Sequence, residues 1–246
     1  MIEPRSLTET REFEEAVELQ KTVWGFNDIE LLPVRLFVVA TKVGGQAMGA
    51  FDSGRMVGFL LAIPGLKPGG GTYMHSHMLG VLAEYRNKGV GRMLKLKQRE
   101  DAMQRGIKLV EWTFDPLELK NAFFNMERLG AIVRRYVENQ YGTTTSPLHG
   151  GLPTDRCVAE WWLASPHAEA VLAGRVPERQ VEERIEVPAD IAVIRRKEPR
   201  RAREIQRSLG ARLVSGFDRG LAVIGFERSE TAGIYLMGKW ECGSNE

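Results

Sequence analysis

Cysteine is scarce in this sequence: only Cys157 and Cys242 occur among 246 residues. They lie far apart and neither belongs to a C-x-x-C pair, so neither a disulfide framework nor a zinc motif is predicted. An excess of charge of one sign is also missing, because 34 Lys and Arg residues face 32 Asp and Glu residues, a formal net charge of +2. This balance gives no electrostatic reason to expect nucleic acid or a membrane as the main partner.

Long apolar runs are missing as well. The longest, residues 56–66, contains Pro64 and Gly65 and is far shorter than the roughly 20 residues that cross a bilayer. Glutamates occupy the N-terminal segment where a secretory signal would need an apolar core. With 43% hydrophobic and 27% charged residues, the composition is that of a globular protein with a sizeable core. The sequence therefore predicts a cytoplasmic protein without a bound metal or a membrane segment.

Cap and turn residues divide the first part of the chain into helices and strands. Ser6 and Glu9 have the spacing of a capping box, and a helix is predicted from there to Gly25. A second helix is predicted over residues 33–42. Two apolar runs around a short turn indicate a hairpin, and a third strand follows a glycine-rich loop. These strands are predicted over residues 46–51, 55–63 and 72–81, with the loop over 64–71.

The three strands over residues 46–81 are predicted to form an antiparallel meander, and the segment after them is predicted to form a crossover connection. A helix predicted over residues 89–105 has a strand on each side, the second over 107–113, which favours a parallel strand pair. Asp115 and Pro116 are typical of a helix start, and Gly130 is typical of its end. Two further strands are predicted over residues 131–137 and 156–163.

The composition of the sequence changes near residue 165. A segment rich in charge and proline is followed by a helical segment over residues 189–209, which Pro199 interrupts. A terminal hairpin is predicted from strands over 221–227 and 233–240. We therefore predict an α/β domain over residues 1–164 and a C-terminal extension of helix and hairpin over residues 165–246.

Residues 78–92 carry the clearest chemical signal. An apolar strand leads through a basic turn with two glycines into a helix. Glycines let a ligand approach the backbone, and the N–H groups at a helix start attract phosphate oxygens. Arg86, Lys88 and Arg92 add positive charge at the same place. The segment therefore predicts a site for an anionic, phosphorylated ligand.

The spacing of the glycines selects among phosphate-binding motifs. A dinucleotide motif would need glycine at the position of Leu94, and a P-loop would need a G-K-[ST] sequence that the glycine-rich segments do not supply. The pattern Arg86-x-x-Gly89-x-Gly91 after an apolar strand resembles the pyrophosphate-binding motif of the GNAT acyltransferase superfamily, which binds acyl-coenzyme A (acyl-CoA). The order of predicted elements over residues 1–164 is similar too. The resemblance implies the GNAT fold, a mixed and mostly antiparallel sheet flanked by helices.

A closer subgroup is similar in three further segments. They are Phe114-Asp-Pro-Leu117, Asn121-Ala-Phe-Phe-Asn125 and Gly151-Leu-Pro-Thr-Asp-Arg156. Some relatives in this subgroup are associated with N-acylation of amino acids. The resemblance therefore implies acetyl-CoA or succinyl-CoA as the co-substrate and a small primary amine, such as an amino acid, as the acceptor.

The resemblance also implies which residues bind the coenzyme. Backbone groups of Leu79, Gly80 and Val81 would align the pantetheine arm, and Asn121 would contact it from the next helix. The pyrophosphate would be bound by the turn and the first residues of the helix, which are Arg86, Asn87, Lys88, Gly89, Val90, Gly91 and Arg92.

Direct attack of an amine on a thioester is helped by a base that takes its proton. His75 and His77 lie on one face of the predicted strand and point the same way as Leu79 and Val81, unless a bulge intervenes. We predict His77 as the base, with Glu111 on the following strand as the second candidate. Packed or surface histidines are the alternative interpretation.

The acid that protonates the leaving thiolate is not the superfamily's common tyrosine, because that position is Met126 here. Methionine donates no proton, so either water or Tyr141 is the acid, or the thiolate leaves without one. Loops that border the acceptor site in the superfamily contain Phe26 and precede Arg156. Arg156 could bind an acceptor carboxylate, or it could pair with Asp155 in a turn.

Other functions stay open at this stage. The missing tyrosine makes a non-catalytic acyl-CoA sensor or adaptor an alternative, and a protein N-acetyltransferase is another. A basic cluster in the extension could bind RNA, an acidic partner or a second subunit in a homodimer. It lacks interleaved aromatic residues, which favours a solvated helix face over nucleic-acid binding. The cluster consists of Arg195, Arg196, Lys197, Arg200, Arg201, Arg203 and Arg207.

Overall fold

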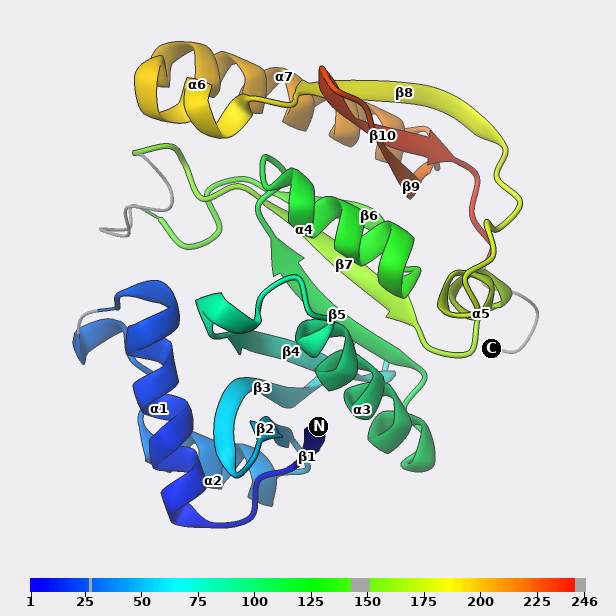
Figure 1. The fold of residues 1–246 in the computed structure, drawn as a ribbon. Coiled ribbons are helices and arrows are strands. Elements are labelled where there is room, and N and C mark those ends of the chain that lie inside the picture. The colour runs from blue at the N-terminus through cyan, green and yellow to red at the C-terminus, as the bar shows by residue number, and fades with distance from the viewer. Residues whose placement is uncertain (27, 143–150, 242–246) are drawn as a thin grey trace. The chain divides into compact units, whose positions relative to one another are not determined.

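The computed structural model describes residues 1–26, 28–142 and 151–241 (Figure 1). The chain forms two compact units, Met1–Glu111 (unit 1) and Trp112–Glu246 (unit 2). The predicted domain boundary after residue 164 rests on a change in amino-acid composition, and it stays a prediction. Among the helices of the described residues, none is long and apolar enough to cross a bilayer.

Unit 1 contains strands in the order β1-β2-β3-β4-β5. The first four pair antiparallel, and β4 pairs with β5 in parallel, which confirms the predicted crossover. α1 and α2 cover one face of these strands and α3 covers the other (Figure 1). The strands are β1 (Ile2–Ser6), β2 (Gln46–Asp52), β3 (Arg55–Leu66), β4 (Thr72–Val81) and β5 (Leu109–Phe114), which continues into unit 2. The helices are α1 (Thr10–Trp24), η1 (Asp28–Glu30), α2 (Val34–Lys42), η2 (Ala83–Tyr85) and α3 (Val90–Gln104).

The start of α1 differs from the prediction. Ser6 is the last residue of β1, and the N-cap of α1 is Glu9. The carboxylate of Glu12 accepts hydrogen bonds from the backbone N–H groups of Thr8 (2.8 Å) and Glu9 (3.1 Å). The predicted capping box is therefore wrong by three residues, because a glutamate in the first turn supplies the acceptor. The predicted end is confirmed, since Gly25 caps the helix in the left-handed conformation with φ 66°.

The β2–β3 hairpin is confirmed, with one difference at its far end. Ser53 (φ 50°) and Gly54 (φ 84°) both have positive φ, as a two-residue hairpin turn requires. β3 continues through Pro64 to Leu66, where a loop was predicted. β2 begins at Gln46, opposite Ala62, so in the described part of the chain the last part of β3 pairs only with β4. A proline, which has no N–H to donate, is tolerated there.

Unit 2 contains strands in the order β7-β6-β9-β10-β8. β6 pairs antiparallel with β7 and β9, and β10 pairs antiparallel with β9 and β8. The strands of both units are thus mixed, mostly antiparallel and flanked by helices, as the resemblance implied. The strands are β6 (Ile132–Val137), β7 (Arg156–Trp162), β8 (Val181–Pro188), β9 (Ala222–Arg228) and β10 (Ala232–Gly238). The helices are α4 (Leu119–Phe123), η3 (Phe124–Leu129), α5 (Pro166–Leu172), α6 (Ile191–Lys197) and α7 (Pro199–Asp218).

Asp115 does not cap a helix, contrary to the prediction. Its carboxylate accepts a hydrogen bond from the Leu117 N–H (2.8 Å) and forms an ion pair with Arg195 (2.9 Å). α4 begins later, at Leu119, and continues as the π-helical turn η3. The end at Gly130 is confirmed, with φ 73°.

The C-terminal part contains more structure than predicted. The helical segment is two helices that meet at Pro199, as predicted, but α7 continues to Asp218 rather than residue 209. The terminal hairpin of β9 and β10 is confirmed. α5 and β8 were not predicted, because their segment is charged and rich in proline.

Candidate coenzyme-binding site

The turn between β4 and α3 has the backbone of an anion site. Asn87 (φ 61°) and Gly89 (φ 82°) both adopt the left-handed conformation, and Gly89 is the N-cap of α3. The first helical bond runs from the N–H of Met93 to the carbonyl of Gly89 (3.0 Å). A helix leaves its first N–H groups without intrahelical acceptors, so those of Val90 and Gly91 can bind an anion together with the positive end of the helix dipole.

The predicted cations have different surroundings. Arg86 Nε donates to the carbonyl of Val81 (3.2 Å), and its Nη2 donates to the carbonyl of Val23 (3.4 Å). This arginine therefore fastens the turn to the ends of β4 and α1. Lys88 is exposed, with its Nζ 5.3 Å from the centre of the Tyr85 ring.

A bulge changes the course of β4 before this turn. Leu61 pairs with Met78 and Ala62 pairs with Ser76, which leaves His77 without a partner on β3. Pairing between β4 and β5 comprises Met74 with Val110 and His75 with Glu111. Among the residues that the structure describes, β4 has no further strand pairing on this edge from Ser76 to Val81.

The bulge also separates the faces of β4. Ser76 accepts a hydrogen bond from Lys95 of α3 (2.8 Å), whereas Met78 packs against the apolar cluster formed with α1 and α2. Two residues that would share a face of a regular strand thus point to opposite faces. The prediction that His75 points the same way as Leu79 is wrong for this reason. The rings of His75 and His77 lie 6.0 Å apart, centre to centre.

The histidines lie beside a buried carboxylate. Burial, with a smaller contribution from neighbouring His77, lowers the pKa of His75, and partial burial lowers the pKa of His77. Both rings are therefore neutral at neutral pH. Glu111, next to His75 in the register, is 3% exposed and forms an ion pair with Lys67.

Sequence reasoning missed two cations around these strands. Lys67 lies in the loop after β3, and only its position opposite β5 brings it to Glu111. Lys95 is buried in α3, where its Nζ donates to Ser76 and to Gln98 Oε1 (3.0 Å). Burial lowers its pKa well below the usual value of lysine. No local pattern marked either residue.

Phe26 and Asn121 were both predicted as site residues. Phe26 follows α1 in unit 1, and its ring stacks on Trp24 at 5.4 Å between centres. Asn121 lies on the exposed side of α4 in unit 2, and its N–H donates to the carbonyl of Glu118 (2.9 Å).

Tyr141 and Arg156 lie together in unit 2. The guanidinium carbon of Arg156 is 5.4 Å from the centre of the Tyr141 ring, and the Tyr141 hydroxyl is 3.0 Å from Thr113 Oγ1. Arg156 also donates to the backbone carbonyl of Asp155 (3.5 Å) rather than to its carboxylate. Met126 is fully buried in η3, which supports the view that it is part of the core.

Comparison with protein families now identifies the fold that carries this turn. Residues 10–130 match the family described as Acetyltransferase (GNAT) family. Residues 10–130, just under half of the chain, are thus similar to GNAT acetyltransferases. Among curated proteins, none matches the sequence.

Solved GNAT structures are similar to this chain in fold. The ribosomal-protein-S18-alanine N-acetyltransferase from Escherichia coli is 18% identical, covers 65% of this chain and 92% of its own, and gives a TM-score of 0.52. Arabidopsis thaliana NAA60 in complex with a bisubstrate analogue is 15% identical, with coverages of 66% and 98% and a TM-score of 0.53. Another structure of NAA60, in complex with acetyl-CoA, is 14% identical with a TM-score of 0.52. At such identities the likeness shows the fold alone.

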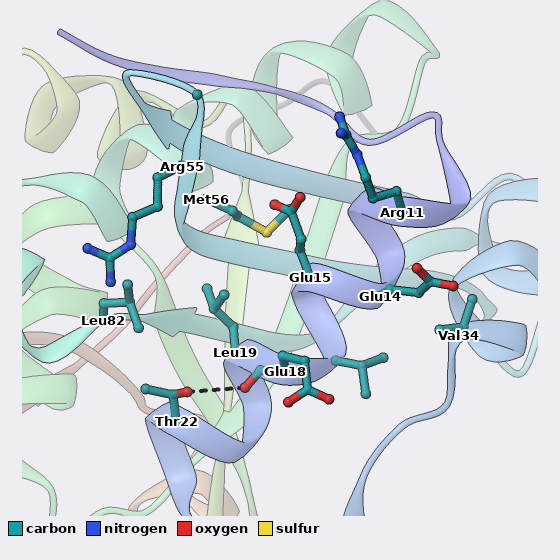
Figure 2. Close-up of a pocket in the computed structure, with 12 residues that line it drawn as sticks. Arg11, Glu14, Glu15, Glu18, Leu19, Thr22, Val34, Arg55, Met56 and Leu82 are labelled. Carbon is teal, nitrogen blue, oxygen red and sulfur yellow. Dashed lines mark hydrogen bonds between the residues drawn. The ribbon is translucent and has the colours of Figure 1, made fainter.

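Unit 1 has a cavity of about 650 Å³ along α1 (Figure 2). Its lining includes the apolar side chains of Met56 and Leu82 and the charged side chains of Glu14, Glu15, Glu18, Arg11 and Arg55. Three carboxylates against two guanidinium groups leave the lining net negative, which disfavours a diphosphate. The turn before α3, and not this groove, is therefore the candidate coenzyme site.

Metal-ligand side chains do not gather in the part of the chain that the structure describes. No group of three or more His, Cys, Asp or Glu residues there could hold a metal ion. The candidate site of this GNAT-like domain is thus built from backbone amides, cations and a strand edge.

Proposed function

We propose that the protein is an acyl-CoA-dependent N-acyltransferase whose acceptor is a small primary amine, with amino acids as the substrate class. One observation carries the proposal: the cationic turn at the start of α3 directly follows the free edge of β4. The similarity to the GNAT family supports the acyl transfer. The donor is acetyl-CoA or succinyl-CoA.

The coenzyme would lie along this edge and end at the turn. The amides of Val90 and Gly91 and the charge of Lys88 and Arg92 suit a diphosphate. Leu79, Gly80 and Val81 offer backbone groups to the amides of pantetheine, in the manner of an added strand. Asn87 and Gly89 give the turn its left-handed shape, and Arg86 positions the turn against β4.

The transfer needs alignment and charge stabilisation more than covalent chemistry. A neutral amine attacks the thioester carbon, the C–N bond forms, and the carbonyl oxygen becomes an oxyanion that a strand amide near Val81 stabilises. The C–S bond then breaks, the nitrogen loses its proton to the base, and the thiolate takes a proton from the acid. Tyr141 or water supplies that proton, since Met126 has none to give.

His77 is the stronger candidate for the base. It is exposed at the bulge of β4, and its lowered pKa leaves the ring neutral, as a proton acceptor must be. Glu111 is engaged by Lys67, which makes its carboxylate less available. In kcat measured at saturating amine, the acid limb that this histidine contributes should lie below the usual histidine pKa of about 6.5, whereas kcat/KM also falls as the free amine is protonated. His77→Gln should remove this acid limb, while His75→Gln, its neighbour on β4, serves as the matched control.

Three arginines of unit 2 could bind the distal carboxylate of a succinyl group or the carboxylate of the acceptor. Arg134 and Arg135 form ion pairs with Glu160 (2.6 and 3.5 Å). Arg156 lies against the Tyr141 ring. Arg156 and Phe26 stay the proposed substrate-binding residues.

Thiol release measured with both donors across amino acids, peptide N-termini and other amines tests the proposal. We expect CoA release that depends on an amine, and a loss of coenzyme affinity of about tenfold for Lys88→Ala. Lys97→Ala is the matched control, because Lys97 lies on α3, away from the turn that contains Lys88, and pairs with Glu100 (2.9 Å). Binding of acyl-CoA without thiol release for any amine would favour the sensor, and acylation of peptides alone would favour a protein N-acetyltransferase. A homodimer and a cytoplasmic location stay predictions.

A further inference from the structure

Unit 2 has a cavity of about 460 Å³ between α7 and the chain around β6. Its lining combines acidic groups on one side with arginines of α7 on the other. The volume is that of a small-molecule site. The charges on its two sides decide what it can bind.

The acidic side centres on Asp155. This residue is 8% exposed, and its carboxylate accepts hydrogen bonds from the Tyr136 hydroxyl (2.6 Å) and the Asn139 N–H (2.9 Å). Among the described residues no cation forms an ion pair with it. A carboxylate has about four acceptor positions, so Asp155 can still accept hydrogen bonds from a ligand cation.

Gln206 adds a second acceptor to this side. Its side chain is buried, and its Nε2 donates to the carbonyl of Pro153 (2.9 Å). That bond fixes which end of the amide is the donor. The Oε1 atom accepts no hydrogen bond from the residues that the structure describes, and Gln206 lines the cavity.

The wall beside Asp155 is held rigidly. Burial and the hydrogen bond to Asp155 raise the pKa of Tyr136, so its hydroxyl stays protonated and keeps donating. α7 approaches this tyrosine closely, because a Cβ at Gly210 would lie 2.7 Å from the Tyr136 hydroxyl oxygen. Tyr136 thus holds one carboxylate oxygen of Asp155, a residue that lines the cavity.

The basic side is formed by Arg203 and Arg207, one turn apart on α7. Arg203 Nη2 donates to the carbonyl of Gly151 (3.4 Å). Arg207 makes neither a hydrogen bond nor an ion pair with any described residue. Arg207 and Asp155 therefore line one cavity without forming an ion pair.

From this separation of charges we infer that the cavity binds a small zwitterion, with its carboxylate at Arg203 and Arg207 and its ammonium group at Asp155 and Gln206. Free amino acids are the corresponding chemical class. A diphosphate does not suit the cavity, because Asp155 and Glu138 would repel it. A plain amine would leave the arginines without a counter-charge. The inference does not rest on the proposed acyl transfer, since all the lining residues named here belong to unit 2 and binding is measured without acyl-CoA.

Calorimetric titration of the full chain with the standard amino acids in both enantiomers, up to about 10 mM, tests this inference. We expect saturable binding of some of them. The corresponding amines without the carboxylate, and the N-acetylated acids without the ammonium group, should bind at least about tenfold more weakly. Arg207→Ala should weaken binding by about tenfold or more, whereas Arg200→Ala, an exposed arginine of the same helix, should leave it unchanged.

Asp155→Asn should weaken binding as well, with thermal unfolding as the check that Tyr136 stays in place. If Asp155→Asn does not fold, Arg207→Ala still decides the case, because that side chain forms no hydrogen bond or ion pair with the residues that the structure describes. Absence of binding for every amino acid would overturn the inference. Equal loss in Arg200→Ala and Arg207→Ala would overturn it too, as would equally tight binding of the amines or the N-acetylated acids. Acyl transfer by Arg207→Ala then tells two roles of the cavity apart, provided that the unaltered protein binds amino acids. If the variant also loses acyl transfer, the cavity is the acceptor site. If its acyl transfer is unchanged, the cavity is a separate effector site.

Discussion

The ammonium group of Lys67 forms an ion pair with the carboxylate of Glu111. The lysine side chain is 31% exposed and that of the glutamate only 4%. Lys67 Nζ is also 4.7 Å from the centre of the Tyr73 ring on β4. The loop after β3 is thus fastened to β5 by a charge that compensates a nearly buried carboxylate.

Lys67→Met should destabilise the protein, because the nearly buried carboxylate of Glu111 would lose the counter-charge of Lys67. We expect a loss of about 2 kcal/mol, less than the roughly 3 to 5 kcal/mol of a fully buried pair, since Lys67 is partly in water. Urea unfolding at neutral pH measures the loss. In the double variant Lys67→Met with Glu111→Gln much of it should be recovered, and a double variant as unstable as the single one would contradict the explanation.

Gly89→Ala should impair the coenzyme site beyond its effect on stability. Gly89 has φ 82°, which costs an alanine about 1 kcal/mol, although its Cβ would meet no atom within 4 Å. Gly69→Ala is the matched control, because Gly69 has φ 98° and equally open surroundings in the loop before β4. We expect similar losses in urea unfolding but weaker acyl-CoA binding for Gly89→Ala alone. Equal affinities in the two variants would speak against the turn as the diphosphate site.

Features of the fold that depend on a few adjacent residues could be predicted from the sequence. Gly25 and Gly130 end helices in the left-handed conformation, which glycine alone adopts without strain. The hairpin turn at Ser53 and Gly54 follows the same logic. The phosphate-binding turn is also local, since its glycines, cations and helix start lie within seven residues of one another.

Features that depend on distant partners could not be predicted in this way. β8 is a charged segment that becomes a strand because β10, about fifty residues later, pairs with it. The bulge at His77 is set by the register with β3, and nothing in the sequence of β4 marks it. Asp115 has the sequence of a helix cap, but the ion pair with Arg195 gives it a different role. Tertiary contacts override local preference in each of these cases.

His167 in α5 should make stability depend on pH. Burial, and the nearby charge of Arg179, lower its pKa to about 4, and its Nε2 has no hydrogen-bond partner among the described residues. In the unfolded state the pKa of His167 is about 6.5. Between about pH 4 and pH 6.5 the unfolded state therefore binds more protons than the folded state. This contribution is therefore complete above about pH 6.5 and is lost as the pH falls towards 4. From pH 7 to pH 5 we expect a loss of about 2 kcal/mol in urea unfolding that His167→Gln does not show. The same pH dependence in both proteins would contradict a neutral, buried His167.

Arg195 and Arg196 are adjacent members of the basic cluster, but they should differ sharply on substitution. Arg195 is 7% exposed and pairs with Asp115 (2.9 Å) and Glu118 (3.2 Å), whereas Arg196 is exposed. Arg195→Met leaves two carboxylates without their counter-charge, so we expect a loss of about 3 to 5 kcal/mol in urea unfolding. Arg196→Met should cost less than about 0.5 kcal/mol, as is usual for surface substitutions. Similar losses for the two variants would mean that the ion pair does not hold α6 to the segment before α4. The expected difference would instead show that one residue of the cluster is part of the core and is not available to an acidic partner.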